Sequence, residues 1–214
     1  MEDLSTPLVL GFVAGFFLLA VLTLTAFVKI SVVLMVIRQG LGLQQVPSNI
    51  IVLALALFLA LFVSAPVFSA SLSAVLDSGV ELNTAQNLFD LWNVAIAPFQ
   101  TFMGRNIDPE HAQFFIASAE ELWVGSGLSA TVEDFVIQVP AFMISELTEA
   151  FRIGFLLYLP FIAIDLAITG ILMALGMQMV QPNIIAVPFK LLLFVFVDGW
   201  ARLAEGLLVG YGGA

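Results

Sequence analysis

Long apolar runs are the feature that most constrains this chain. They cover residues 8–37, 50–76, 153–180 and 184–209. At a rise of about 1.5 Å per helical residue, the first run alone is long enough to cross a bilayer core of about 30 Å. Only 10% of the residues are charged, against about 25% in a typical soluble domain. We therefore predict an all-α membrane protein with four hydrophobic segments.

Residues 77–139, between the second and third runs, differ in kind because they are acidic. Their only base is Arg105. Asp108-Pro109 and Thr131 with Asp134 resemble helix starts. Apolar side chains also recur at helical spacing, at Leu88, Trp92, Ile96, Phe99 and Met103. We predict a small acidic helical subdomain here, and the alternative is a disordered acidic loop.

Prolines and polar turns divide the apolar runs into bent helical hairpins. Pro66 is expected to kink or end its helix, and Pro160 and Pro188 to bend theirs. Gln181-Pro182 separates the third run from the fourth. We predict a hydrophobic helical hairpin at residues 1–76, the acidic subdomain at 77–139 and a C-terminal hairpin with a methionine loop at 140–214.

The few basic residues indicate how the chain crosses a membrane. Arg38 lies in the short loop after the first run, whereas the large loop is acidic. Basic residues favour the cytoplasmic side, so we expect both termini and the acidic subdomain outside, in the periplasm of a Gram-negative cell. The first residues, MEDLSTPLVLGF, lack the basic start of a cleaved signal peptide, and we expect them in the mature protein.

Composition and motifs exclude several classes of function. The chain has no cysteine and a single histidine, His111, so we predict no metal site and no cofactor. A net charge of −10 argues against nucleic acid as a partner. No HExxH or GxSxG motif occurs, and Asp165 with Asp198 is a weak aspartate pair, so we do not expect an enzyme.

Charged residues inside the apolar runs need a partner or water, because a charge at membrane depth costs at least about 2.5 kcal/mol. These residues are Lys29, Asp165, Lys190 and Asp198.

Lys190 is the hardest of these charges to place. In a hairpin centred at Gln181-Pro182, Asp165 and Asp198 come to similar depth, and Lys190 has no partner. We therefore expect Lys190 to pair with Glu146 of a neighbouring copy. Two alternatives stay open: Lys190 extends to the membrane interface, or Asp165, Asp198 and Lys190 carry protons in a transporter.

Small residues and methionines complete the set of candidate positions. Small residues four apart let helices approach closely, and the glycines among them are Gly11, Gly15, Gly170, Gly206 and Gly210. Met173, Met177 and Met179 cluster around Gly176. From composition alone methionines are usually packing filler, although a flexible thioether also suits a seal that deforms around varied sequence.

Four sequence blocks in order resemble a known family. They are TAFVKISVVLMVIRQGLGLQQVPSN (residues 25–49), VPAFMISELTEAFRIGFLLYLPFIAIDL (139–166), ILMALGMQMV (171–180) and VPFKLLLFVFVDGW (187–200). Together they resemble the R subunit of the type III secretion export gate, the family that includes flagellar FliP. The ending GLLVGYGG and the sequence Glu121-Leu122-Trp123 resemble the virulence injectisome branch.

The resemblance implies a structural, pore-forming subunit in the bacterial inner membrane, multi-pass and with a periplasmic portion. Such subunits form a homopentamer, join small S and T export-gate subunits, and meet other inner-membrane export proteins and the inner rod. The assembly conducts unfolded secretion substrates and stands largely above the membrane plane. The family's methionine loop closes the pore and maps onto Met177, Gln178 and Met179, where Gln178 interrupts the usual run of methionines. The competing hypothesis is a stand-alone proton-coupled transporter of small solutes.

Overall fold

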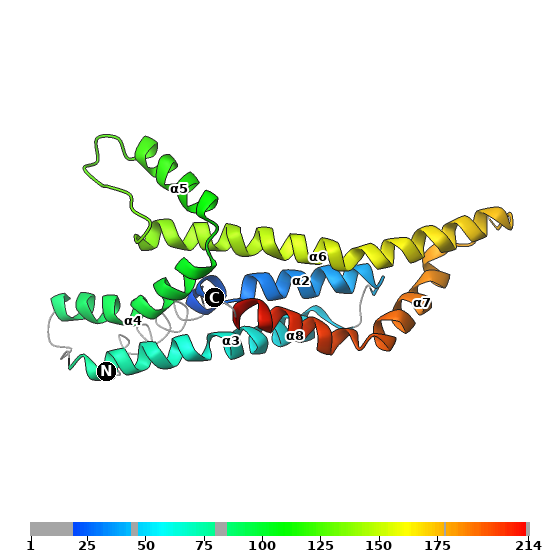
Figure 1. The fold of residues 1–214 in the computed structure, drawn as a ribbon, viewed down its shortest axis with the longest axis horizontal. Coiled ribbons are helices and arrows are strands. Elements are labelled where there is room, and N and C mark those ends of the chain that lie inside the picture. The colour runs from blue at the N-terminus through cyan, green and yellow to red at the C-terminus, as the bar shows by residue number, and fades with distance from the viewer. Residues whose placement is uncertain (1–18, 44–46, 80–84, 178, 213–214) are drawn as a thin grey trace, which may run out of the picture. The chain divides into compact units, whose positions relative to one another are not determined.

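The computed structural model describes residues 19–43, 47–79, 85–177 and 179–212. Every regular element in these ranges is a helix, which confirms the predicted all-α class (Figure 1). The helices are α2 (Phe27–Gly40), α3 (Asn49–Asp77), α4 (Ala85–Asn106), α5 (Pro109–Leu122), α6 (Phe135–Ala174), α7 (Pro182–Phe196) and α8 (Gly199–Gly212).

The chain forms two compact units. The first consists of Met1–Val28 and Ala60–Glu146, and the second of Lys29–Leu59 and Leu147–Ala214. Both α3 and α6 contribute to each unit, so the units do not follow single stretches of sequence. The division at residues 77 and 140 stays a prediction.

The first unit has an aromatic core built on α4 and the start of α6. Leu24, Ile96, Met103 and Phe142 form this core, and Phe99 packs against it. Ile96, Phe99 and Met103 are on the face of α4 that the helical spacing predicted. The acidic segment therefore forms packed helices that share a core with Leu24 and Phe142 from outside it, and the disordered alternative is wrong.

Side-chain hydrogen bonds cap one helix of this unit and close the turn before another. The Asp108 carboxylate accepts a 2.9 Å hydrogen bond from the Glu110 backbone N–H, and Pro109 takes the first helical position, as predicted. The Asp134 carboxylate accepts from the backbone and hydroxyl of Thr131 at 2.7 and 2.9 Å, just before α6 starts at Phe135. The third apolar run is thus only the second part of a longer helix.

In the second unit, α2 lies between α6 and α8 (Figure 1). Two glycines allow the close contact between α2 and α6. A Cβ at Gly40 would come within 2.8 Å of Tyr158 and Phe161, and one at Gly154 within 3.0 Å of Val36. These contacts place Ile37 and Phe161 in the interior, 2% and 4% exposed.

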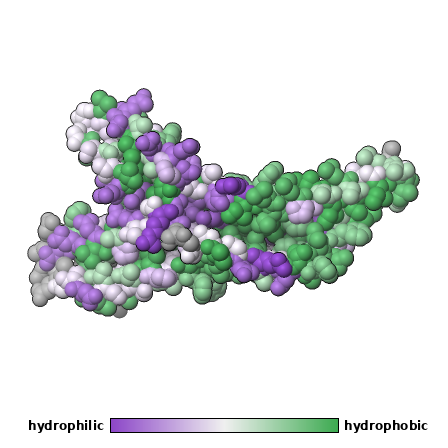
Figure 2. Space-filling view, in the orientation of Figure 1, coloured by the Kyte–Doolittle hydropathy of each residue, from purple (hydrophilic) through white to green (hydrophobic). Residues whose placement is uncertain are grey.

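Two described helices, α3 and α6, are long and apolar enough to cross a membrane. The pair α7–α8 adds a third crossing if its two helices count as one span bent by 60°. Figure 2 shows apolar surface gathered over the second half of α6 and over α7. Pro66 does not end α3, because the helix continues to Asp77. Of the first apolar run, residues 8–18 are outside the described ranges.

Candidate functional site

The turn between α6 and α7 is the candidate site. The backbone conformation of one glycine, Gly176, shapes its first half. Gly176 has φ +69°, a conformation that glycine adopts without steric cost. The Met177 N–H donates to the Leu172 carbonyl at 2.9 Å, and the Gly176 N–H donates to the Met173 carbonyl at 3.1 Å. This pattern is a Schellman motif, which ends α6 and satisfies its last carbonyls.

The second half of the turn leads into α7 and exposes methionine side chains. The Val180 N–H donates to the Met177 carbonyl at 3.3 Å. Gln181 occupies the N-cap position of α7 without a side-chain capping bond, and Pro182 is the first helical residue. Met177 is 43% exposed and Met179 is fully exposed. We refer to residues 175–181 as the methionine turn. Gln178, its central residue, lies outside the described residues.

An ion pair with a buried lysine joins α6 and α7, the helices that flank the methionine turn. The Lys190 ammonium donates to an Asp165 carboxylate oxygen at 2.6 Å. The Lys190 side chain is 3% exposed and that of Asp165 is 35% exposed. The expectation that Lys190 lacks a partner within its own hairpin is therefore wrong.

The error arose from the position of the hairpin's centre. The phenyl rings of Phe161 and Phe194 meet at 6.4 Å, each one helical turn farther from the methionine turn than the ion pair. Both contacts place the centre between positions 177 and 178, about one helical turn before Gln181-Pro182. The Schellman motif ends α6 early, and Lys190 rather than Asp198 then lies opposite Asp165.

Pairing between Lys190 and Glu146 of another copy stays a prediction, but its premise is gone. Lys190 already holds a carboxylate, and Glu146 is only 1% exposed within one copy. Of the other charges, Lys29 is 8% exposed, and its ammonium lies 4.1 Å from the centroid of the Tyr211 ring, a cation–π contact. Asp198, also expected to be buried, is exposed in the single chain at the bend between α7 and α8.

The predicted packing glycines make no close contact within one described chain. A Cβ at Gly170, Gly206 or Gly210 would meet no atom within 4 Å. Their use between copies stays a prediction, and Gly11 and Gly15 lie outside the described residues. Close glycine contacts occur instead at Gly40, Gly42, Gly154 and Gly199, which the small-residue spacing did not single out.

The geometry around the methionine turn suits a mechanical role. Within the described ranges, no cluster of three or more His, Asp or Glu residues could hold a metal ion. The turn instead offers flexible thioethers on a short loop between two helices joined by an ion pair and an aromatic contact. Such an element can form a deformable apolar seal or a contact with another surface, because its tip is apolar and its base is fixed.

The apolar helices and the fixed hairpin define a helical membrane protein. The FliP family profile matches residues 10–207, and the chain belongs to the FliP family. It is 48% identical to "Probable translocation protein y4yL" of Sinorhizobium fredii, covering 92% of this chain and 89% of that protein. It is 41% identical to "Yop proteins translocation protein R" of Yersinia pestis, covering 99% and 98%. It is 40% identical to "Surface presentation of antigens protein SpaP" of Shigella flexneri, covering 87% of each.

Sequence reasoning missed the contacts that position the turn, although the sequence contained a signal. Asp165 with Lys190 and Phe161 with Phe194 share one midpoint, and within each helix the two residues are four apart. An antiparallel helical pair with a short turn brings such residues together. Testing each possible midpoint for matching pairs would have found the ion pair.

Proposed function

We propose that this chain is the R subunit of a type III secretion export gate. Copies assemble with small S and T subunits in the bacterial inner membrane, around a channel for unfolded proteins. Relatives named for translocation and secretion support this class of function. The observation that carries the mechanical part is the methionine turn, with Met179 fully exposed above a hairpin fixed by the Lys190–Asp165 pair.

The methionine turn acts in this proposal as the gasket of the closed gate. Met177 and Met179 from each copy meet at the channel axis, where apolar thioethers exclude water and hydrated ions. Because these side chains are unbranched, they move aside for substrates of varied sequence and close behind them. The ion pair keeps the base of the turn in place while the tip deforms.

The stand-alone transporter is less favoured by the geometry. A proton carrier needs a carboxylate that gains and loses its proton during the cycle. Asp165 instead holds Lys190 at 2.6 Å, so its carboxylate is engaged in a contact between α6 and α7. The pair therefore suits a fixed structural contact better than proton transfer.

Replacing the tip methionines tests the gasket. We expect Met177→Ala with Met179→Ala to make cells that express the assembled gate leak ions, because small side chains no longer fill the closed channel. Ion conductance of membranes carrying the complex is the measurement. Met173→Ala is the matched control. Met173 is exposed like the two tip methionines, at 62%, but it lies on α6 before the turn.

The result is interpretable only at equal amounts of assembled complex, which immunoblots of native gels measure. A leak with the double variant and none with Met173→Ala supports the gasket. Unchanged conductance in the double variant, at normal complex levels, removes this role from the methionine turn.

A further inference from the structure

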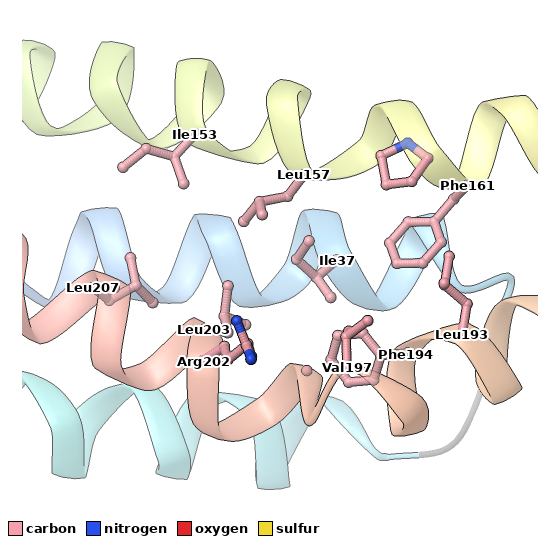
Figure 3. A pocket seen from close by; sticks show the side chains of 13 residues that line it. Ile37, Ile153, Leu157, Phe161, Leu193, Phe194, Val197, Arg202, Leu203 and Leu207 are labelled. Carbon is pink, nitrogen blue, oxygen red and sulfur yellow. The ribbon is translucent and has the colours of Figure 1, made fainter.

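An apolar cavity in the second unit is not used by the proposed function. It has a volume of about 490 Å³ and lies among α2, α6, α7 and α8. Figure 3 shows Ile37, Phe161, Leu203 and Leu207 converging on it from three helices. All four are at most 8% exposed, so they form an apolar floor. A site of this size falls in the range of small-molecule pockets.

The rim of the cavity is exposed and carries one charge. Leu157 and Val197 are 37% and 42% exposed, and Arg202 also lines the cavity and is exposed. Within the described residues, no carboxylate lies within ion-pair distance of the Arg202 side chain. The cavity thus combines an apolar interior with a guanidinium at its rim.

The lining of this cavity suits an apolar occupant better than water. A stable buried water needs two to four polar partners, which the floor residues do not offer. Gly206 leaves the space open, because it lines the cavity and a Cβ there would meet no atom within 4 Å. The surrounding helices belong to a membrane protein, so acyl chains are the apolar molecules at hand.

We propose that this cavity binds one acyl chain of an anionic phospholipid, with the lipid phosphate on Arg202. The charge of the rim favours an anion, and basic residues at pockets between membrane helices are known to hold anionic headgroups. Arginine suits phosphate because its planar guanidinium forms two parallel hydrogen bonds to it. This inference goes beyond the proposed function and stands without it.

Filling the cavity from α8 tests the acyl-chain part. Gly206→Leu adds a side chain beside the floor, whereas Gly210→Leu adds the same group one turn later, at a position that does not line the cavity. The purified full chain in delipidated detergent micelles is titrated with phosphatidylglycerol or phosphatidylethanolamine, and native mass spectrometry counts the retained lipids. We expect Gly206→Leu to lose one bound phosphatidylglycerol and Gly210→Leu to retain it.

Removing the rim charge tests the headgroup part without filling the cavity. Arg202→Gln should lower the preference for phosphatidylglycerol over phosphatidylethanolamine about fivefold, the effect of one basic group near an anionic lipid. Arg152→Gln is the matched control, because Arg152 is 75% exposed, does not line the cavity and pairs with Glu149.

The outcomes separate the lipid from other occupants. Equal lipid counts in Gly206→Leu and Gly210→Leu overturn the proposal. A changed number of protein copies in Gly206→Leu, with lipid binding intact, also overturns it, because the cavity then holds a side chain of a neighbouring subunit. If Arg202→Gln leaves the preference for phosphatidylglycerol unchanged, Arg202 does not bind the lipid phosphate.

Discussion

At the scale of single residues, Lys190 and Asp165 are the pair on which the methionine turn depends. Their contact is short and the lysine is nearly inaccessible, at 3% exposed. A buried ion pair adds little stability over an apolar pair of the same volume, but breaking one leaves a buried charge alone. The pair therefore acts mainly on geometry, by fixing which residues of α6 and α7 face each other.

The two single substitutions at this pair should destabilise the protein by different amounts. Asp165→Asn should lower the free energy of unfolding by about 3 kcal/mol, because Lys190 stays buried and charged. Lys190→Met should cost less, roughly 1 kcal/mol, because Asp165 is 35% exposed and keeps its water. Equilibrium unfolding in detergent measures both.

The double variant Asp165→Leu with Lys190→Met should recover most of the stability lost in Asp165→Asn, because it leaves no buried charge. Glu149→Gln is the control, since its ion pair with Arg152 is 3.6 Å long and exposed and should contribute less than about 1 kcal/mol. If Asp165→Asn and Glu149→Gln cost the same, the buried pair does not hold the hairpin.

The backbone conformation of Asp198 predicts how substitutions at this position change stability. Its φ is +52°, the left-handed region, at the bend between α7 and α8. Asp198→Val should lower the free energy of unfolding by about 1–2 kcal/mol, because a β-branched residue tolerates this conformation poorly. Asp198→Gly should be neutral or stabilising, as thermal unfolding would show. A greater loss with Gly than with Val would mean that the carboxylate, not the backbone, sets this position.

At the scale of elements, α2 packs closely on α6 and this contact forms part of the interior of the second unit. Gly40 and Gly154 are the points of closest approach, and both would clash with side chains of the opposite helix if a Cβ were added. A hydrophobic pattern alone does not identify such positions, because glycine contributes no apolar side chain to it.

Alanine at these glycines should distinguish packed from open positions. Gly40→Ala should destabilise the protein by about 1–3 kcal/mol, because the added methyl group meets Tyr158 and the buried Phe161 at 2.8 Å. Gly170→Ala, in the open part of α6, should instead stabilise it by about 0.5–1 kcal/mol through lower backbone entropy. Chemical denaturation of the two variants beside the parent measures this difference, and equal effects would contradict the α2–α6 packing.

The sequence predicted the kinds of elements better than their limits. Apolar length and the Asp108 cap identified helices, because both act locally along the chain. The Schellman motif at Gly176 was missed, since its signal is one glycine near a more conspicuous proline. The partner of Lys190 was missed for the same reason, because the position of a turn decides which residues face across it.

The length of α6 was also hidden, because its first residues fall in the segment predicted to be acidic and its charged residues interrupt the apolar pattern before Ile153. This helix has 40 residues, about 60 Å along its axis, twice the thickness of a bilayer core. Glu146, Glu149 and Arg152 lie in its first half, and only Asp165 is charged beyond them. We therefore expect the first half of α6 to lie outside the hydrocarbon.

At the scale of the whole molecule, much apolar surface remains exposed in a single chain. Phe58, Phe62, Phe155, Leu192 and Phe196 are each more than half exposed. Lipid, other copies or different subunits must cover such surface, because contiguous apolar patches do not stay in water. An export gate assembled from several small membrane subunits accounts for this surface, and a solitary transporter would need lipid over all of it.

Subunit stoichiometry tests the export-gate assignment most directly. The chain is co-expressed with the two small membrane proteins encoded as its S and T partners, extracted in mild detergent and weighed by native mass spectrometry. The account predicts a pentamer of this chain that retains both partners. A monomer or dimer that binds neither partner, and that transports solute when reconstituted alone in vesicles, would contradict it.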